Sequence, residues 1–209
     1  MRCWDEHVVP RVTDKLLGNA DVRTHRAQVM GGLHGTVVEI GFGSGLNVPA
    51  YPPEITTVLA IEPSEVARRL ARPRVAASPV HVEFRGLDGQ RLPFDDDSVD
   101  GALSTFTLCT IPDASLALRE LHRVMKPGAT FHFLEHGLSP DPGVARWQHR
   151  LNRMQRACAG GCNLDRAIDQ LIVDAGFELP EVHHDSMKGP KCMAPWSYLY
   201  TGLAIKPGP

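Results

Sequence analysis

The sequence predicts an α/β fold: a mostly parallel, doubly wound sheet of seven strands with helices on both faces. Two observations lead to this prediction. There are five short β-rich runs, and several of them are apolar nearly throughout, as strands buried on both faces must be. Helical segments alternate with these runs, and that alternation is typical of a parallel sheet whose strands are joined by crossover helices.

The expected elements follow from periodicity and from residues that start or stop helices. We expect strands at residues 36–40, 57–61, 80–84, 99–104, 129–134, 181–185 and 197–205. We expect helices at residues 6–17, 21–33, 64–77, 114–125, 143–159 and 165–175. Gly18 is expected to end the first helix, Asp21 to cap the second and Gly176 to end the last, because glycine and short polar residues occupy such positions.

The chain length fits a single domain. Its 209 residues, 43% of them hydrophobic, suffice for one large core. We expect one domain over residues 1–209, with N-terminal lid helices over 1–35, a cofactor-binding core over 36–137, and C-terminal helices and last strands over 138–209. With 22 Lys and Arg against 24 Asp and Glu, the net charge of -2 argues against a nucleic-acid partner, whose site normally carries a basic surplus.

Secretion and membrane insertion are not expected. The longest apolar runs, such as residues 57–61, are far shorter than the ~20 residues of a membrane span. Residues 1–7 already contain the acidic Asp5 and Glu6, and they lack the apolar stretch of a signal peptide. Five cysteines, an odd number, indicate reduced thiols and therefore a cytoplasmic location.

A glycine-rich loop follows the first expected strand. Gly41, Gly43 and Gly45 stand at every second position, where glycine allows unusual backbone angles and close approach of a ligand. The dinucleotide-binding fingerprint needs a glycine where Leu46 stands, and a P-loop needs a Gly-Lys-Ser/Thr sequence that is absent here. Glu39, two positions upstream, would repel a pyrophosphate but suits a ligand that carries an ammonium group.

The pattern E-x-G-x-G-x-G over residues 39–45 resembles motif I of the class I S-adenosylmethionine-dependent methyltransferases. Three further segments match family motifs in register: residues 87–94, 97–100 and 118–128. The sequence departs from the family pattern where Leu87 and Ala129 replace glycines. The resemblance implies a Rossmann-like methyltransferase fold, S-adenosyl-L-methionine as cofactor and S-adenosyl-L-homocysteine as its product.

The same resemblance implies roles for individual residues in binding the cofactor. Glu62, at the end of the second expected strand, matches the residue that binds both ribose hydroxyls. Asp88 matches the acceptor of the adenine amino group, and the backbone N–H of the next residue meets the adenine ring. The full set that we expect to bind the cofactor is Glu39, Gly41, Gly43, Gly45, Asn47, Glu62, Pro63, Asp88, Gly89 and Thr105.

A narrower resemblance concerns the methyl acceptor. Segments outside the cofactor motifs are similar to the methyltransferase-like seven group of alkyl-thiol methyltransferases, and they lie at residues 51–53, 107–109, 133–136, 147–148 and 161–164. This implies a small-molecule acceptor, with a small thiol as first choice. The chain departs from that group by lacking its apolar N-terminal anchor. Two alternatives stay open: O-, N- or C-methylation of a phenolic or quinone-like metabolite, and a regulatory protein that binds S-adenosylmethionine without catalysis.

Four residues are candidates for the acceptor side. Ligands of doubly wound sheets bind beyond the carboxyl ends of the strands, where Phe106 and His136 should lie. Trp4 and His7 belong to the N-terminal segment that could close over the cofactor. His136 is the candidate catalytic residue, as a base for a phenol-type acceptor. Alternatively, His136 only satisfies backbone groups at a strand end, and Trp4 only packs at the terminus.

No metal site is expected. Cys158, Cys162, Cys192 and the pair His183–His184 lack the usual zinc-ligand spacing, and no carboxylate cluster suited to Mg²⁺ is evident. Four arginines are expected on one face of the helix at 143–159, opposite a core stripe of Trp147, Leu151, Met154 and Cys158; they are Arg146, Arg150, Arg153 and Arg156. That face is expected to be solvated, and a weak contact with an anionic membrane surface stays open.

Overall fold

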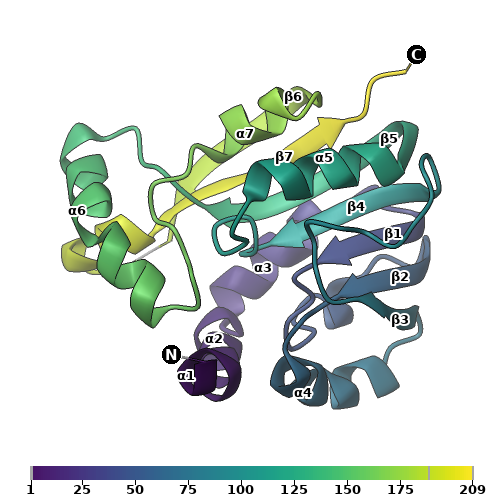
Figure 1. Ribbon diagram of the computed structural model, residues 1–209, viewed down its shortest axis with the longest axis horizontal. Helices are drawn as coiled ribbons and strands as arrows, with labels where there is room; N and C mark the ends of the chain where they lie inside the picture. The colour runs from purple at the N-terminus through teal and green to yellow at the C-terminus, as the bar shows by residue number, and fades with distance from the viewer. Residues whose placement is uncertain (1, 188, 209) are drawn as a thin grey trace.

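Seven strands form one sheet in the computed structural model, which describes residues 2–187 and 189–208 (Figure 1). The strands are β1 (Gly35–Ile40), β2 (Ile55–Ile61), β3 (His81–Gly86), β4 (Val99–Thr105), β5 (Met125–His136), β6 (Glu178–Ser186) and β7 (Tyr198–Ile205). The α-helices are α1 (Arg2–His7), α2 (Val9–Leu17), α3 (Ala20–Val29), α4 (Glu65–Ala76), α5 (Ala114–Val124), α6 (Pro142–Cys158) and α7 (Ile168–Asp174). Two 3₁₀ helices are η1 (Val48–Ala50) and η2 (Lys191–Trp196).

The strand order is β3-β2-β1-β4-β5-β7-β6. Strands β1 to β5 pair in parallel, whereas β7 runs antiparallel to both β5 and β6. The chain therefore winds outward from β1 in one direction to β3 and then in the other to β4 and β5. The predicted fold class, a mostly parallel seven-stranded sheet, is confirmed.

Helices cover both faces of the sheet because alternate residues of each strand point to opposite sides. Phe133 of β5 packs with Leu118 of α5 and Ile172 of α7 in one apolar cluster. Leu134, the next residue in the strand, belongs to the opposite cluster together with Met30 after α3. Figure 1 shows α5 and α7 in front of the sheet and α3 behind it.

The beginning of the chain departs from the predicted elements. The single helix expected at residues 6–17 is two helices, α1 and α2, which meet at Val8. Pro10 stands in the first turn of α2, where its missing N–H costs no hydrogen bond. The predicted cap Asp21 is wrong, because Asn19 caps α3: its side chain accepts a 3.0 Å hydrogen bond from the N–H of Val22.

Strand β5 is longer than the predicted run at residues 129–134. Antiparallel pairing with β7 extends to its last residue, since His136 lies opposite Leu199. Tertiary pairing thus decides where this strand ends, and it places His136 at the carboxyl edge of the sheet.

Helix α6 contradicts the predicted core stripe. Trp147 and Met154 are 54% and 55% exposed, and Cys158 is also exposed. The buried side of α6 is polar instead: the Gln148 side chain is fully buried and binds backbone groups of Gly137 and Ser139. Burial by hydrogen bonding rather than by apolar contact explains why periodicity misassigned this helix.

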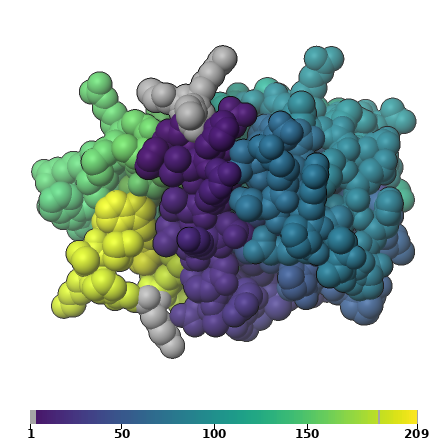
Figure 2. Space-filling view, turned by 90° about the horizontal axis from the view of Figure 1, so that it is seen from below, coloured from purple at the N-terminus to yellow at the C-terminus, as the bar shows by residue number. Residues whose placement is uncertain are grey.

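The N-terminal helices lie against the carboxyl edge of the parallel strands. Asp14 of α2 accepts a 2.6 Å hydrogen bond from the Ser44 hydroxyl in the loop after β1, and pairs with Arg74 of α4 at 2.8 Å. The Trp4 indole N–H of α1 donates to the carbonyl of Cys158 at 2.8 Å. Figure 2 shows these helices between the half of the molecule that carries α4 and the half that carries α6. Within the described residues, none of the helices combines the length and apolarity that a membrane crossing requires.

We expect the α5 contact with the sheet to carry much of the stability. Leu118 is fully buried on α5, whereas Leu116 of the same helix is 37% exposed. Leu118→Ala should lower the free energy of unfolding by about 2–5 kcal/mol, because it leaves a cavity, and Leu116→Ala by well under half of that. Urea unfolding of both variants measures the difference; equal losses would contradict the packing described here.

Candidate active site

The glycine loop after β1 packs directly on the segment that follows β4. Gly41, Gly43 and Gly45 have φ angles of 68°, 59° and 75°, a region that residues with a Cβ rarely adopt. A Cβ at Gly41 would also overlap the side chain of Thr107. At these three positions the loop exposes backbone without a Cβ, which favours close approach by a ligand.

Glu62 joins this loop to the end of β2. Its Oε2 accepts from the N–H of Gly43 and its Oε1 from the N–H of Ser64, both at 2.7 Å. Burial raises the pKa of this carboxyl, and the two backbone hydrogen bonds oppose that shift. A carboxylate has about four lone-pair sites, so both oxygens can still accept from ligand hydroxyls.

Glu39 is buried at the end of β1 inside a network of polar side chains. It accepts hydrogen bonds from the amide of Asn47 at 2.8 Å and from the hydroxyl of Tyr51 at 2.5 Å. Burial raises its pKa to about 7, although these hydrogen bonds and the nearby Arg26 oppose the shift. Both oxygens of Glu39 thus already have partners within the protein.

Arg26 completes this network, and the sequence analysis missed it. The residue lies on α3, is 3% exposed, and donates through Nη1 to Asn47 Oδ1 at 2.7 Å and to Thr105 Oγ1 at 2.6 Å. Burial lowers its pKa to about 10, so it stays charged at neutral pH. Its Nε is buried without a partner among the described residues. The signal was available: Arg26 stands four residues after Val22 and three before Val29, the buried positions of α3.

Asp88 lies at the open end of the site, after β3. It is exposed, and its Oδ1 accepts from the backbone N–H and the side-chain amide of Gln90 at 2.9 and 3.1 Å. A surface hollow beside it is lined by residues 85–88 and 91–95. Gly89 follows, and Pro63 is exposed next to Glu62.

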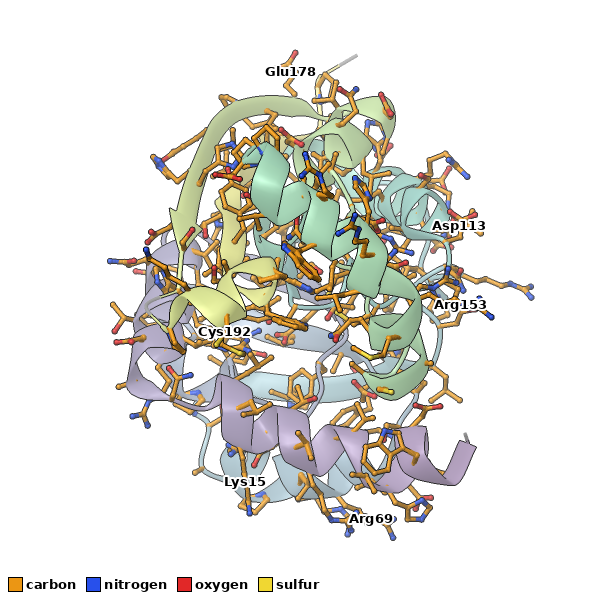
Figure 3. The ribbon with its side chains drawn as sticks, turned by 90° about the vertical axis from the view of Figure 1, so that its left-hand side faces the viewer. Lys15, Arg69, Asp113, Arg153, Glu178 and Cys192 are labelled. Atoms are coloured by element: carbon orange, nitrogen blue, oxygen red, sulfur yellow. The ribbon has the colours of Figure 1, made fainter. Side chains whose placement is uncertain are left out.

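The acceptor candidates fall in two places. Phe106 comes directly after β4 and His136 is the last residue of β5. The two strands are neighbours at this edge, where Thr105 pairs with Leu134. Phe106 has a φ of 55° and its ring lies 5.4 Å from the Arg26 guanidinium carbon. Trp4 and His7 lie on α1, and both are exposed. Figure 3 shows these N-terminal helices along one border of the molecule, with α6 and the segment of Cys192 above them.

His136 sits in a cluster that the spacing of the cysteines did not reveal. Its Nε2 lies 3.4 Å from Cys162 Sγ, which lies 3.7 Å from Cys109 Sγ. Cys109 and His136 are buried, and the side-chain ligand atoms of all three residues lie within 4.8 Å of one another. The hydrogen bond to Cys109 and burial raise the pKa of the Cys162 thiol, which stays protonated. The structure therefore groups Cys162 with residues after β4 and β5.

Glu135, beside this cluster, holds the loop after β4. Its Oε1 accepts from the Ser104 hydroxyl at 2.7 Å and from the N–H of Thr107 at 2.9 Å. Its Oε2 is buried with no partner among the described residues, and burial raises the pKa of the carboxyl. An unsatisfied buried oxygen at this edge leaves one position for a water or a ligand donor.

Comparison with known proteins agrees with this geometry. A family model described as a methyltransferase domain matches residues 38–133. A thiol S-methyltransferase from Homo sapiens is 29% identical over 71% of this chain and 62% of its own length. A demethylmenaquinone methyltransferase from Clavibacter sepedonicus is 34% identical over 53% of this chain and 44% of its own length. A solved S-adenosylmethionine-dependent methyltransferase from Thermotoga maritima, 22% identical, superposes with a TM-score of 0.66 over 97% of this chain and 99% of that one.

The fold is that of solved S-adenosylmethionine-dependent methyltransferases, and residues 38–133 match a methyltransferase domain. Within that class the chain is similar in sequence to the thiol S-methyltransferases. It spans 62% and 59% of the length of two such relatives.

The residues present fit S-adenosylmethionine as the cofactor. No side chain beyond its chain neighbours lies within 4 Å of a Cβ placed at Gly43, Glu62 has spare lone pairs beside this glycine, and Asp88 is exposed after β3. Arg26 has a buried donor without a partner in the same region as Glu39. These groups match the hydroxyl donors, the amino donor and the charged ends of the amino-acid portion of S-adenosylmethionine.

The raised pKa of Glu39 predicts a pH-dependent stability. A carboxyl whose pKa is about 7 when folded and 4.5 when unfolded stabilises the folded state most below pH 4.5, and this contribution is lost as the pH rises through 7. The loss amounts to about 3 kcal/mol. Urea unfolding of the cofactor-free protein at pH 5 and pH 8 should show a smaller decrease in Glu39→Gln than in the wild type, because only the contribution of Glu39 is removed.

The exposed Glu54 offers a matched control. Glu54→Gln should keep the full pH dependence of the wild type. If Glu39→Gln also keeps it, the carboxyl of Glu39 does not bind a proton in the folded protein.

Proposed function

We propose that this chain transfers a methyl group from S-adenosylmethionine to the sulfur of a small thiol. The observation that carries the proposal is the extent of its similarity to thiol S-methyltransferases, which reaches 71% of the chain and goes beyond the matched methyltransferase domain at residues 38–133. The likeness therefore involves more of the chain than the matched methyltransferase domain.

The predicted cofactor residues each bind a different part of S-adenosylmethionine. The glycine loop receives the amino-acid portion and the sugar, Glu62 binds the ribose hydroxyls, and Asp88 accepts from the adenine amino group. Asn47 and Thr105 act through Arg26, since both bind its guanidinium. Arg26 holds the carboxylate of the methionine portion, because an arginine fork pairs well with a carboxylate.

Glu39 plays an indirect part in this proposal. Its oxygens are occupied by Asn47 and Tyr51, so it orders the network and supplies negative charge near the ligand's ammonium group. Pro63 and Gly89 shape the turns beside Glu62 and Asp88.

The acceptor side needs little chemistry from the protein. The bound cofactor supplies an electrophilic methyl group, and the nucleophile must be aligned with it while water is excluded. Phe106 provides an apolar wall, and α1 with Trp4 and His7 closes over the site. A free thiol with a pKa near ~8.5 is already a few per cent thiolate at neutral pH, so a strong base is not required.

A second candidate is methylation of a quinone-like or phenolic metabolite. The 34% identity to a demethylmenaquinone methyltransferase favours it, although that similarity covers only 53% of the chain. Such an acceptor requires removal of a less acidic proton, for which His136 is the candidate base. His136 Nε2 already has Cys162 Sγ as a partner at 3.4 Å, so the ring nitrogen is not free to take that proton.

Arg26→Lys tests the carboxylate-binding role. The variant keeps the positive charge but loses the fork, so binding of S-adenosylhomocysteine should weaken by about 1–3 kcal/mol. Binding of 5′-methylthioadenosine, which lacks the amino-acid portion, should be unchanged. Calorimetric titration of both ligands measures this, with Arg23→Lys on the exposed side of α3 as the control. An equal loss for both ligands would show that Arg26 only supports the fold.

A panel of acceptors with labelled cofactor tests the reaction itself. Small alkyl thiols should be methylated, with kcat/KM rising about tenfold per pH unit below the pKa of each thiol and levelling off above it. The matching alcohols should give no product. S-adenosylhomocysteine should raise the melting temperature of the same sample, because it binds only the folded state.

Three other outcomes would overturn the thiol proposal. Methylation of phenols or quinols alone would favour the second candidate. Cofactor binding without turnover of any acceptor would favour a regulatory role. No thermal shift at millimolar cofactor would remove the methyltransferase reaction altogether.

A further inference from the structure

Three ligand groups for a soft metal ion converge at the carboxyl edge of the sheet. Cys109 lies in the loop after β4, His136 is the last residue of β5, and Cys162 follows α6. Among the described residues, these three side chains form a possible metal-binding group, because their ligand atoms all lie within 4.8 Å of one another. No role in binding the cofactor has been assigned to either cysteine.

Two of the three separations between the ligand atoms match a tetrahedral zinc site, and the third is within 4.8 Å. Zinc–sulfur bonds of about 2.3 Å and zinc–nitrogen bonds of about 2.0–2.1 Å place tetrahedral ligands about 3.8 Å apart for two sulfurs and about 3.5 Å apart for sulfur and nitrogen. The observed separations are 3.7 Å between the two Sγ atoms and 3.4 Å between Cys162 Sγ and His136 Nε2. We propose that Cys109, His136 and Cys162 bind one Zn²⁺ ion and leave its fourth position open.

The backbone around the cluster is already tied together. The backbone N–H and the side-chain amide of Asn163 both donate to the carbonyl of Cys109, at 2.7 and 2.9 Å. Arg166 donates to the carbonyls of Leu108 and Ile111 in the same loop. The segments that carry the two cysteines are therefore fixed to each other by hydrogen bonds that do not involve the sulfur atoms, and an ion would meet ligands already in position.

The charges balance when the ion binds. Zn²⁺ replaces the protons of the two thiols, which pass to solvent, and the neutral imidazole of His136 adds no charge. Two thiolates and one divalent cation form a neutral group, which can stay in this buried place more easily than an isolated charge. Cys162 is only partly buried, so the ion has a route in from its side.

Three protein ligands and one open position are typical of catalytic rather than structural zinc. Because Cys109 and His136 lie at the edge where doubly wound sheets bind their ligands, the open position can take a thiolate from the acceptor. The acceptor thiol would give its proton to solvent and bind through sulfur. This second step rests on the proposed function, whereas the metal site itself does not.

Cobalt substitution tests the metal site. The full chain, reduced and kept free of oxygen, should bind one Co²⁺ per molecule, with the near-ultraviolet absorption of thiolate–cobalt bonds. Cys109→Ser and Cys162→Ser should lose that absorption and weaken binding at least about 100-fold, since loss of a ligand exceeds loss of an outer partner. Cys158→Ser and Cys192→Ser, which change exposed cysteines, should keep it.

Melting temperatures keep the test valid if a serine variant folds poorly. Zn²⁺ should raise the melting temperature of the wild type and of the two control variants, but not of the cluster variants. A wild type that binds neither ion would overturn the metal site. So would an oxidant-induced disulfide between Cys109 and Cys162 in a protein that binds no metal, because the pair would then be a redox couple.

A thiol titration tests whether the fourth position of the ion binds a thiol, independently of whether the protein methylates that thiol. Adding a small alkyl thiol to the cobalt-loaded protein should change its visible spectrum, and the matching alcohol should not. An unchanged spectrum in a protein that binds cobalt would overturn the open position. A changed spectrum without any methylated thiol in the acceptor panel would instead contradict the proposed function.

Discussion

The buried contact between Arg26 and the polar groups around Glu39 organises the whole cofactor edge. Through Asn47 and Thr105 this one guanidinium joins α3 to the loop after β1 and to the end of β4. Leaving such a charge unpaired in a buried place would cost several kcal/mol, so the three elements must keep their positions relative to one another. The glycine loop can be bare backbone because its surroundings are held in this way.

The loop after β4 links the two halves of the site. Its first part packs on the glycine loop through Thr107 and is held by Glu135. Its next residues carry Cys109 and are held by Asn163 and Arg166 from the chain after α6. A ligand that moves one end of this loop would therefore also shift the residues at the other end. The proposed cofactor site and the proposed zinc site thus share a single short segment.

The N-terminal helices differ from this core in how they are attached. Asp14 joins α2 to the buried Ser44 and the partly exposed Arg74, and Trp4 joins α1 to the end of α6 at the surface. Polar contacts at exposed positions are individually weak. The proposed closing role of α1 over the site requires such an attachment, since α1 would then open without disturbing the buried network.

The sequence by itself determined the fold class, the glycine loop and the positions of Glu39, Glu62 and Asp88, because each depends on local chemistry or on motifs contiguous in the chain. It could not show that α6 buries Gln148 or that Cys162 meets Cys109. Arg26 was within reach of helical periodicity, but not its partners at Asn47 and Thr105. Local patterns act over a few residues, whereas these contacts join residues as far as 79 positions apart, so only the order of strands in the sheet decides them.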